Sequence, residues 1–323
     1  MIDDLSDSAS IGSRPQRTPS EYGLVVQKSP TSARLIHGSC TDAAQLCPDL
    51  LGKVTLVVTS PPYHNAISYE SHADDPTTDY RARQGIDYAD EYLPLMNSAW
   101  KSMRALLRDG GYLAVNVGTV LESGYHHPLP MDIIAQLTSD EGEWEFVRSI
   151  IWHKVTAGVK RAGSVIQHKL PGYWYPNIMT EHLIVVRKPG KWLPLSTDVP
   201  EEWWHDVWDL APVPPRTVAH PAPFPEDLPH RLIRMLTQPG EIVVDPFNGS
   251  GATTKAAADL QRQAVGFDVE PKYLALAKDR LTTTSSVRRL QLRVTPRMAL
   301  KFFPKKMRGQ TRHGSGLHSR RGK

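Results

Sequence analysis

The chain has 323 residues, of which 40% are hydrophobic and 22% charged, and its formal net charge is +4. A chain of this length can bury a sizeable core, so we expect one large α/β domain or a domain with insertions. Its only cysteines, Cys40 and Cys47, exclude a disulfide scaffold and show no zinc-ligand spacing. No apolar run approaches the length of a membrane span and no signal peptide opens the chain, so we expect a cytoplasmic protein.

Charge is unevenly distributed along the chain. Residues 286–323 hold 12 Lys or Arg and no Asp or Glu, whereas residues 1–285 hold 26 basic and 34 acidic side chains. The positive net charge therefore comes from a basic tail on an acidic body. Such a tail can bind phosphates without sequence preference, or it can be a solvated segment that only favours solubility. We expect residues 1–20 and the last ten or so residues to be disordered.

The hydrophobic pattern predicts alternating strands and helices. In chain order we expect strands over Arg34–His37 and Val54–Thr59, a helix over Tyr88–Arg108 ended by Gly110 and Gly111, a strand over Tyr112–Val117, a helix over Met131–Leu137, strands over Glu145–His153 and Glu181–Arg187, a helix over Glu226–Leu236, a strand over Glu241–Asp245, a helix through Ala256–Ala258, and a strand over Ala264–Asp268.

The predicted strand Val54–Thr59 ends abruptly in Ser60-Pro61-Pro62-Tyr63. Two consecutive prolines cannot continue a central strand, so the chain must turn there. The turn leaves a hydroxyl, carbonyl oxygens and an aromatic ring at the carboxyl edge of the sheet, where open α/β sheets bind ligands. These groups suit the capture of a planar amine such as an exposed nucleobase, although a proline-rich loop without a chemical role explains the segment equally well.

A second signal lies in the predicted strand, glycine-rich turn and helix that start at Glu241. Gly249 and Gly251 would let the backbone approach a ligand closely. Asp268, at the end of the following strand, stands 19 positions after Gly249, which is the spacing at which a carboxylate accepts hydrogen bonds from a ribose diol. An ordinary βαβ unit with a glycine-rich turn and no ligand remains the alternative.

Together, Thr59-Ser60-Pro61-Pro62-Tyr63 and Asp245-Pro246-Phe247-Asn248-Gly249-Ser250-Gly251 resemble the catalytic and cofactor motifs of the amino-methylating DNA methyltransferases. The catalytic motif comes first, as in the permuted β group of that family. Residues 220–229, 266–273 and 181–186 resemble further motifs in the expected order, and the match covers roughly residues 33–282. One motif departs, because Gly38-Ser39 stands where the family usually has Gly-Asp near the cofactor's adenine.

The resemblance implies a Rossmann-like α/β fold with a mostly parallel twisted sheet, helices on both faces and a circularly permuted motif order. It implies a methyltransferase domain over 21–285, with a catalytic half at about 33–188 and a cofactor half at about 220–282. It also implies S-adenosylmethionine as the cofactor. The cofactor-binding residues would be Asp245, Phe247, Asn248, Gly249, Ser250, Gly251, Asp268, Phe224 and Thr59, and the catalytic residues Ser60, Pro61, Pro62 and Tyr63.

The chemistry follows from the nature of the acceptor. An exocyclic amine conjugated with its base is a poor nucleophile, so acceptors aimed at its hydrogens, the Ser60 hydroxyl and the Pro61 carbonyl, would free its lone pair. The base would be flipped out and stacked on Tyr63, so Tyr63→Phe should keep most activity. In this family a Ser at position 60 is associated mainly with cytosine N4 and an Asp mainly with adenine N6. We therefore expect N4-methylcytosine, with adenine N6 as the alternative. An RNA or other methyltransferase and a non-catalytic nucleic-acid-binding protein also remain open.

Residues 64–87 and 154–180 are expected to contact double-stranded DNA. The second segment mixes cationic Lys154 and Lys160 with aromatic Tyr173 and Trp174, which suits phosphate and base contacts, although these rings could simply pack the loop. The histidines at 64, 72, 126 and 127 lack a paired metal pattern, so we expect no metal. We expect a monomer or weak dimer.

Overall fold

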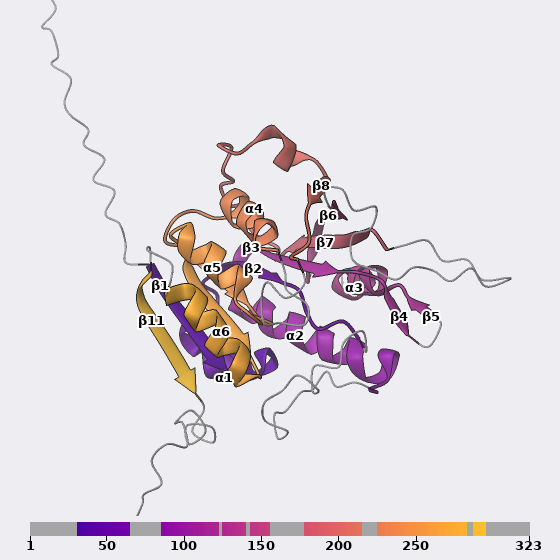
Figure 1. Ribbon diagram of the computed structural model, residues 1–323, viewed down its shortest axis with the longest axis horizontal. Coiled ribbons are helices and arrows are strands. Elements are labelled where there is room, and N and C mark those ends of the chain that lie inside the picture. Colours follow the sequence, from indigo (N-terminus) through magenta and orange to yellow (C-terminus); the bar gives the residue numbers. More distant parts are fainter. Residues whose placement is uncertain are drawn as a thin grey trace, which may run out of the picture.

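The computed structural model describes residues 31–64, 85–122, 125–139, 143–155, 178–214, 225–282 and 287–294. Nine strands form one sheet in the order β11-β1-β10-β9-β2-β3-β7-β6-β8, and β4 and β5 form a separate hairpin (Figure 1). The strands are β1 Thr31–His37, β2 Val54–Thr59, β3 Leu107–Val117, β4 Val120–Glu122, β5 Tyr125–His127, β6 Glu145–Lys154, β7 Thr180–Arg187, β8 Val207–Leu210, β9 Ile242–Asp245, β10 Gln263–Asp268 and β11 Val287–Val294.

Parallel pairing joins the strands from β11 to β3, and among the described strands of this sheet only β7 runs against its two neighbours. The sheet is therefore mostly parallel, as the sequence predicts. In such sheets the strands are buried on both faces and read as continuous apolar runs. All six residues of β2 are buried in this way.

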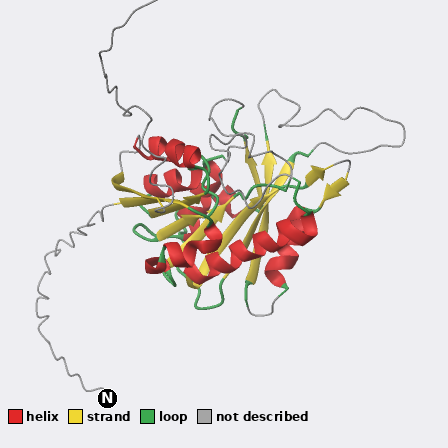
Figure 2. Ribbon diagram, turned by 90° about the horizontal axis from the view of Figure 1, so that it is seen from below, coloured by secondary structure: helices red, strands yellow, loops and turns green. Residues whose placement is uncertain are grey.

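Helices cover both faces of the sheet (Figure 2). The helices are α1 Ala43–Leu46, α2 Leu93–Leu106, α3 Leu129–Thr138, α4 Asp227–Leu236, α5 Ala252–Asp259 and α6 Pro271–Thr282, and a π-helical turn, Tyr88–Tyr92, precedes α2. In β2, Val57 joins the core beneath α1, α2 and α3, whereas Leu56 and Val58 join the core beneath α4, α5 and α6. Because successive side chains point to opposite faces, one short strand contributes to both cores.

One predicted boundary is wrong. The helix expected over Tyr88–Arg108 ends at Leu106, and β3 begins at Leu107, five residues before the predicted start. Gly110 and Gly111 lie inside this strand, and Gly110 adopts a φ of +78°. The pairing of β3 with β2 shifts register in this region, so the glycines form an irregularity that the strand can absorb instead of ending an element.

The sheet also extends beyond the domain boundary expected at residue 285. β11 pairs in parallel with β1, so the beginning of the basic segment forms an edge strand. Val287, Leu290, Leu292 and Val294 show the partial apolar alternation of a strand, which the high arginine content obscured. Residues 295–323, like residues 1–20, lie outside the described part of the chain.

The order of the central strands places the site. The chain leaves β2 towards α2 on one face, whereas it leaves the neighbouring β9 towards α5 on the other face. Such a divergence opens a crevice at the carboxyl ends of parallel strands, where α/β proteins bind ligands. Among the described helices, none is long and apolar enough to cross a bilayer.

Candidate functional site

The turn of residues 60–63, here called the proline turn, follows β2 directly at this crevice. Thr59, the last residue of β2, donates a hydrogen bond of 2.7 Å from its hydroxyl to Asp245 Oδ1 at the end of β9. Asp245 opens the second predicted motif, so this bond joins the two motifs across 186 positions of sequence. The sequence predicted both motifs, and the parallel pairing of β2 with β9 brings them together.

Other contacts fix the proline turn residue by residue. The Tyr92 hydroxyl donates to the Pro62 carbonyl at 2.8 Å, and the Tyr63 hydroxyl donates to Glu181 Oε2 at 2.7 Å. Pro61 is buried, while Ser60 is half-buried. The Ser60 hydroxyl makes no hydrogen bond to any residue that the structure describes. The turn is thus held at Pro62 and Tyr63, while the Ser60 hydroxyl keeps its full hydrogen-bonding capacity.

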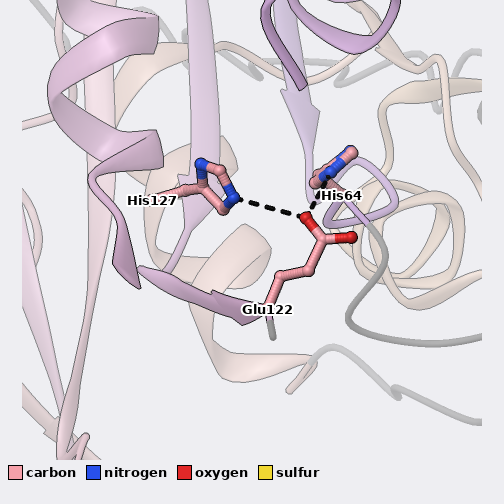
Figure 3. A group of neighbouring side chains, drawn as sticks. All are labelled: His64, Glu122 and His127. Atoms are coloured by element: carbon pink, nitrogen blue, oxygen red, sulfur yellow. Dashed lines mark hydrogen bonds and ion pairs between the residues drawn. The ribbon is translucent and has the colours of Figure 1, made fainter. Parts of the chain in front are cut away.

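His64, which follows the proline turn, lies in a group of three side chains with Glu122 and His127 (Figure 3). Glu122 of β4 lies between two histidines, with its Oε2 2.8 Å from His64 Nε2 and 3.3 Å from His127 Nε2. Each of the three side chains has an atom that could bind a metal ion, and these atoms lie within 4.8 Å of one another. The spacing of the residues in the sequence did not predict this group. A hydrogen bond from His64 and an ion pair from His127 to one carboxylate account for this geometry, and the hydrogen bond ties the β4–β5 hairpin to the residue that follows the proline turn. The expected absence of a metal stays a prediction.

Residues 245–251, here called the glycine turn, connect β9 to α5. Asn248 donates its backbone N–H to the Phe267 carbonyl of β10, and its Oδ1 accepts from the Thr254 hydroxyl of α5 at 2.9 Å. Gly249 and Gly251 adopt φ values of +48° and +85°, which L side chains rarely adopt. The glycines are therefore required by the backbone conformation of the turn itself.

Asp268 at the end of β10 faces this turn. Its Oδ2 accepts the Gly249 N–H at 2.7 Å and its Oδ1 accepts the Glu270 N–H at 2.8 Å. Burial raises the pKa of Asp268 to about 7, although both backbone N–H groups oppose the shift. Burial likewise raises the pKa of Asp245 to about 6, against the hydrogen bond from Thr59. Two carboxyls that titrate near neutrality therefore lie at adjacent strand ends, as is common at functional sites.

The remaining predicted cofactor residues occupy different positions. Phe247 is partly buried and meets Trp100 of α2 edge-to-face, with ring centroids 6.4 Å apart. Ser250 is buried and its hydroxyl accepts a hydrogen bond from Arg280 of α6. Ser250 is thus bound to a neighbouring helix, which makes it a structural part of the turn. Phe224 lies outside the described residues.

Gly38-Ser39, the departure from the family pattern, lies beside Asp268. The Gly38 N–H donates to the Asp268 carbonyl at 3.0 Å, and the Ser39 hydroxyl accepts from the Thr41 N–H. Ser39 therefore begins a short helical turn at the end of β1. Gly38-Ser39 therefore lies next to Asp268, the residue predicted to bind the ribose. Ser39 occupies the position at which the resembling family usually has an Asp.

Sequence reasoning did not identify Glu181 and Asn116 as site residues. Both are largely buried, and both contact Tyr63 from strands β7 and β3. Each is a polar residue at the end of an apolar strand, because Asn116 lies in Tyr112–Val117 and Glu181 begins a run of apolar residues. This pattern could have identified both as candidate site residues. Lys154, at the start of the second predicted DNA-contacting segment, forms an ion pair with Glu181. Most of both predicted DNA-contacting segments, residues 65–84 and 156–177, lies outside the described residues.

Comparison with known proteins gives a family for this arrangement. A family model described as DNA methylase matches residues 54–279, which include both turns. The chain belongs to this family. A relative, the Type II methyltransferase M.BglII of Bacillus subtilis, is 30% identical over 267 residues, which make up 76% of this chain and 67% of the relative. The Type II methyltransferase M.MjaI of Methanocaldococcus jannaschii is 24% identical over 198 residues.

Coverage of the relatives is partial. The chain covers 65% of M.MjaI, 31% of the Type II methyltransferase M.BglI of Bacillus subtilis and 27% of the Type II beta methyltransferase M.BslI of a Bacillus strain. Solved structures show the same fold more completely. A putative DNA modification methylase of Thermus thermophilus, TTHA0409, is 28% identical, with a TM-score of 0.58 over 80% of this chain and 98% of that one. The PvuII DNA methyltransferase, described as cytosine-N4-specific, has a TM-score of 0.59 at 19% identity, which shows the fold alone.

Proposed function

We propose that this protein transfers a methyl group from S-adenosylmethionine to an exocyclic amine of a flipped base in double-stranded DNA. The hydrogen bond from Thr59 to Asp245 carries the proposal, because it holds the proline turn and the glycine turn side by side at the carboxyl ends of β2 and β9. Membership of the DNA methylase family supports the reaction class. A solved structure of the Thermus relative, 28% identical to this chain, is described as complexed with S-adenosyl-L-methionine.

The residues at the glycine turn fit this cofactor. Asp268 offers carboxylate oxygens at the end of the second strand, and each keeps accepting capacity beside its one backbone bond. We infer that Asp268 accepts from the ribose hydroxyls, and that Gly249 brings the backbone close to the ligand. Phe247 supplies an apolar wall next to α2. When bound, the cofactor supplies an electrophilic methyl group on a sulfonium.

The proline turn would prepare the acceptor amine. The Pro62 carbonyl already accepts from the Tyr92 hydroxyl, and we assign the Pro61 carbonyl and the Ser60 hydroxyl as the acceptors for the amine hydrogens. Two fixed acceptors draw the amine towards a tetrahedral form and free its lone pair, and they need no reorganisation during the reaction. The Tyr63 ring gives the extruded base a stacking surface. This chemistry needs no covalent enzyme intermediate.

Asp268→Ala is expected to weaken cofactor binding by about 1–3 kcal/mol, the scale for hydrogen bonds to a charged group. The affinity should also depend on pH. The Asp268 pKa is raised to about 7, and the ribose hydroxyls are expected to bind its ionised carboxylate. The affinity for S-adenosylmethionine should therefore fall about tenfold from pH 8 to pH 6. Calorimetric titration of the protein with S-adenosylmethionine at several pH values measures both effects.

The matched control is Asp268→Asn, which keeps the shape of the side chain and removes its titration. Its affinity should be lower than that of the wild type at pH 8 and should lack the tenfold dependence on pH. An Asp268→Ala variant with wild-type affinity would contradict the ribose contact. The raised pKa also means that, without cofactor, Asp268 lowers the free energy of unfolding as pH rises from about 4 to about 7.

For the acceptor, we propose cytosine N4. The support is Ser60, whose neutral hydroxyl can accept from the amine and can also donate to a ring nitrogen such as N3 of cytosine. Adenine presents the same edge of an amine beside a ring nitrogen, so adenine N6 is the competing acceptor. DNA incubated with the protein and S-adenosylmethionine should yield N4-methylcytosine on digestion to nucleosides and mass spectrometry. N6-methyladenine without N4-methylcytosine would overturn the choice of base and keep the rest of the mechanism.

We further propose that the enzyme modifies specific sites in the cytoplasm of a prokaryotic cell, as part of a restriction-modification system or alone. The Type II methyltransferase relatives from Bacillus and Methanocaldococcus support this setting. Residues 64–87, 154–180 and the basic tail are the proposed DNA-contacting parts. A monomer or weak dimer stays the prediction for the assembly.

A further inference from the structure

Glu181 receives three hydrogen-bond donors from three different parts of the fold. Its Oε2 accepts from the Tyr63 hydroxyl at 2.7 Å and from Asn116 Nδ2 at 2.5 Å, and its Oε1 lies 2.5 Å from Lys154 Nζ. Asn116 Nδ2 also lies 3.1 Å from the Tyr63 hydroxyl oxygen, which closes a triangle around that oxygen. The Tyr63 hydroxyl is therefore fixed by two side chains from two neighbouring strands, β3 and β7.

The side chains that hold the Tyr63 hydroxyl are buried. Glu181 is 9% exposed and Asn116 is 1% exposed. A Cβ added to Gly118 would lie 3.1 Å from Glu181 Cγ, so the glycine makes room for the carboxylate stem. A buried carboxylate needs both hydrogen bonds and a positive partner, and Lys154 supplies the charge. Glu181 is thus a buried carboxylate whose charge and oxygens are matched by neighbouring groups.

We propose that Glu181 is the positioning residue of the proline turn, and that it acts through the Tyr63 hydroxyl to hold the Tyr63 ring where a flipped base stacks. The inference rests on the proposed role of Tyr63 as the stacking surface. Glu181 makes no contact with the reacting atoms in this scheme. It fixes an aromatic ring at its far end, while the backbone of the turn and the Tyr92 bond to Pro62 fix the near end.

Lys154 gives this arrangement a link to the predicted DNA-contacting segment. It is the last residue of β6, and the chain then enters residues 155–177. Its ion pair with Glu181 therefore joins the start of that segment to the proline turn. A ring held at both ends is pre-organised for stacking, and displacement of a reacting group by about 1 Å can cost on the order of 100-fold in rate.

The test is a double-mutant cycle of Glu181→Gln and Tyr63→Phe. Lys154 Nζ and Asn116 Nδ2 can only donate, so the amide nitrogen of Gln must face one of these two donors. We expect each single variant to lower the single-turnover rate of DNA methylation by about 10- to 100-fold. The double variant should be no slower than the slower single variant, because both changes remove one interaction. The affinity for S-adenosylmethionine should stay unchanged in all three.

Glu145→Gln is the matched control. Glu145 also forms an ion pair between β6 and β7, with Arg187, but at the opposite end of the two strands. This variant should keep the wild-type rate, so a loss specific to Glu181 is not a general effect of breaking a pair on these strands. A merely structural role would lower the melting temperature and leave the rate of the folded Glu181→Gln variant intact.

Wild-type rate in Glu181→Gln, or losses that multiply in the double variant, would overturn the inference. If the wild type methylates DNA and Tyr63→Ala does not, such results refute only the part assigned to Glu181. A wild type that transfers no methyl group to any DNA would overturn the proposed function, and the inference with it. The expected loss in Tyr63→Phe also departs from the sequence-based expectation, because stacking alone predicts that Phe keeps most activity.

Discussion

Tyr63→Ala is expected to abolish methylation of DNA while binding of S-adenosylmethionine persists. Base–aromatic stacking contributes about 1–3 kcal/mol per base, and the truncation also removes the hydroxyl that Glu181 and Asn116 hold. The two losses act on the same step, since both concern the position of the flipped base. Single-turnover methylation and calorimetric cofactor titration on the same preparation measure the two properties separately.

The internal control for Tyr63→Ala is the cofactor site. The Thr59 bond to Asp245 and the glycine turn do not depend on the ring, so the affinity for S-adenosylmethionine should match that of the wild type. A variant that keeps full methylation activity would show that the ring is not the stacking surface. A loss of both activity and cofactor affinity would indicate that the truncation disturbs the fold, because Tyr63 also packs against the core beneath α2.

Gly251→Val is expected to destabilise the fold itself. Gly251 adopts a φ of +85°, and a Cβ there would lie 2.8 Å from Ala277 Cβ and 3.0 Å from Ala277 Cα in α6. Backbone strain of about 1–3 kcal/mol adds to an overpacking cost of about 1–3 kcal/mol. Thermal unfolding should therefore show a melting temperature lower by roughly 4–24 °C, at about 2–4 °C per kcal/mol for a domain of this size.

Gly240→Val is the matched control for this effect. Gly240 adopts a φ of +88°, but a Cβ there would meet nothing within 4 Å. The control therefore carries the same backbone strain without the collision with α6, and its melting temperature should fall less. Equal losses in the two variants would show that packing of the glycine turn against α6 contributes nothing. The glycine thus permits close packing of α5 against α6, whereas its sequence context suggested an approach to the ligand alone.

Local patterns in the sequence determined much of the fold. The apolar run Val54–Thr59 and its two following prolines fixed a central strand and its end, and the structure gives the same bounds. The strand that ends at Asp245, the glycines after it and the strand that ends at Asp268 were also correctly predicted. These signals succeed because side-chain periodicity and the backbone limits of proline and glycine act over a few neighbouring residues. They fail at Gly110, which lies inside a strand and does not end a helix.

The sequence by itself therefore determined the two turns, the strands that carry them and the family to which their motifs point. Only the tertiary structure decided which side chains meet: Thr59 with Asp245 across 186 positions, and Tyr63 with Glu181 across 118. Strand order and register bring these pairs together, because β9 lies beside β2 and β7 lies beside β3. A polar residue at a strand end has no partner in its own segment, so its role depends on which strand the sheet places next to it.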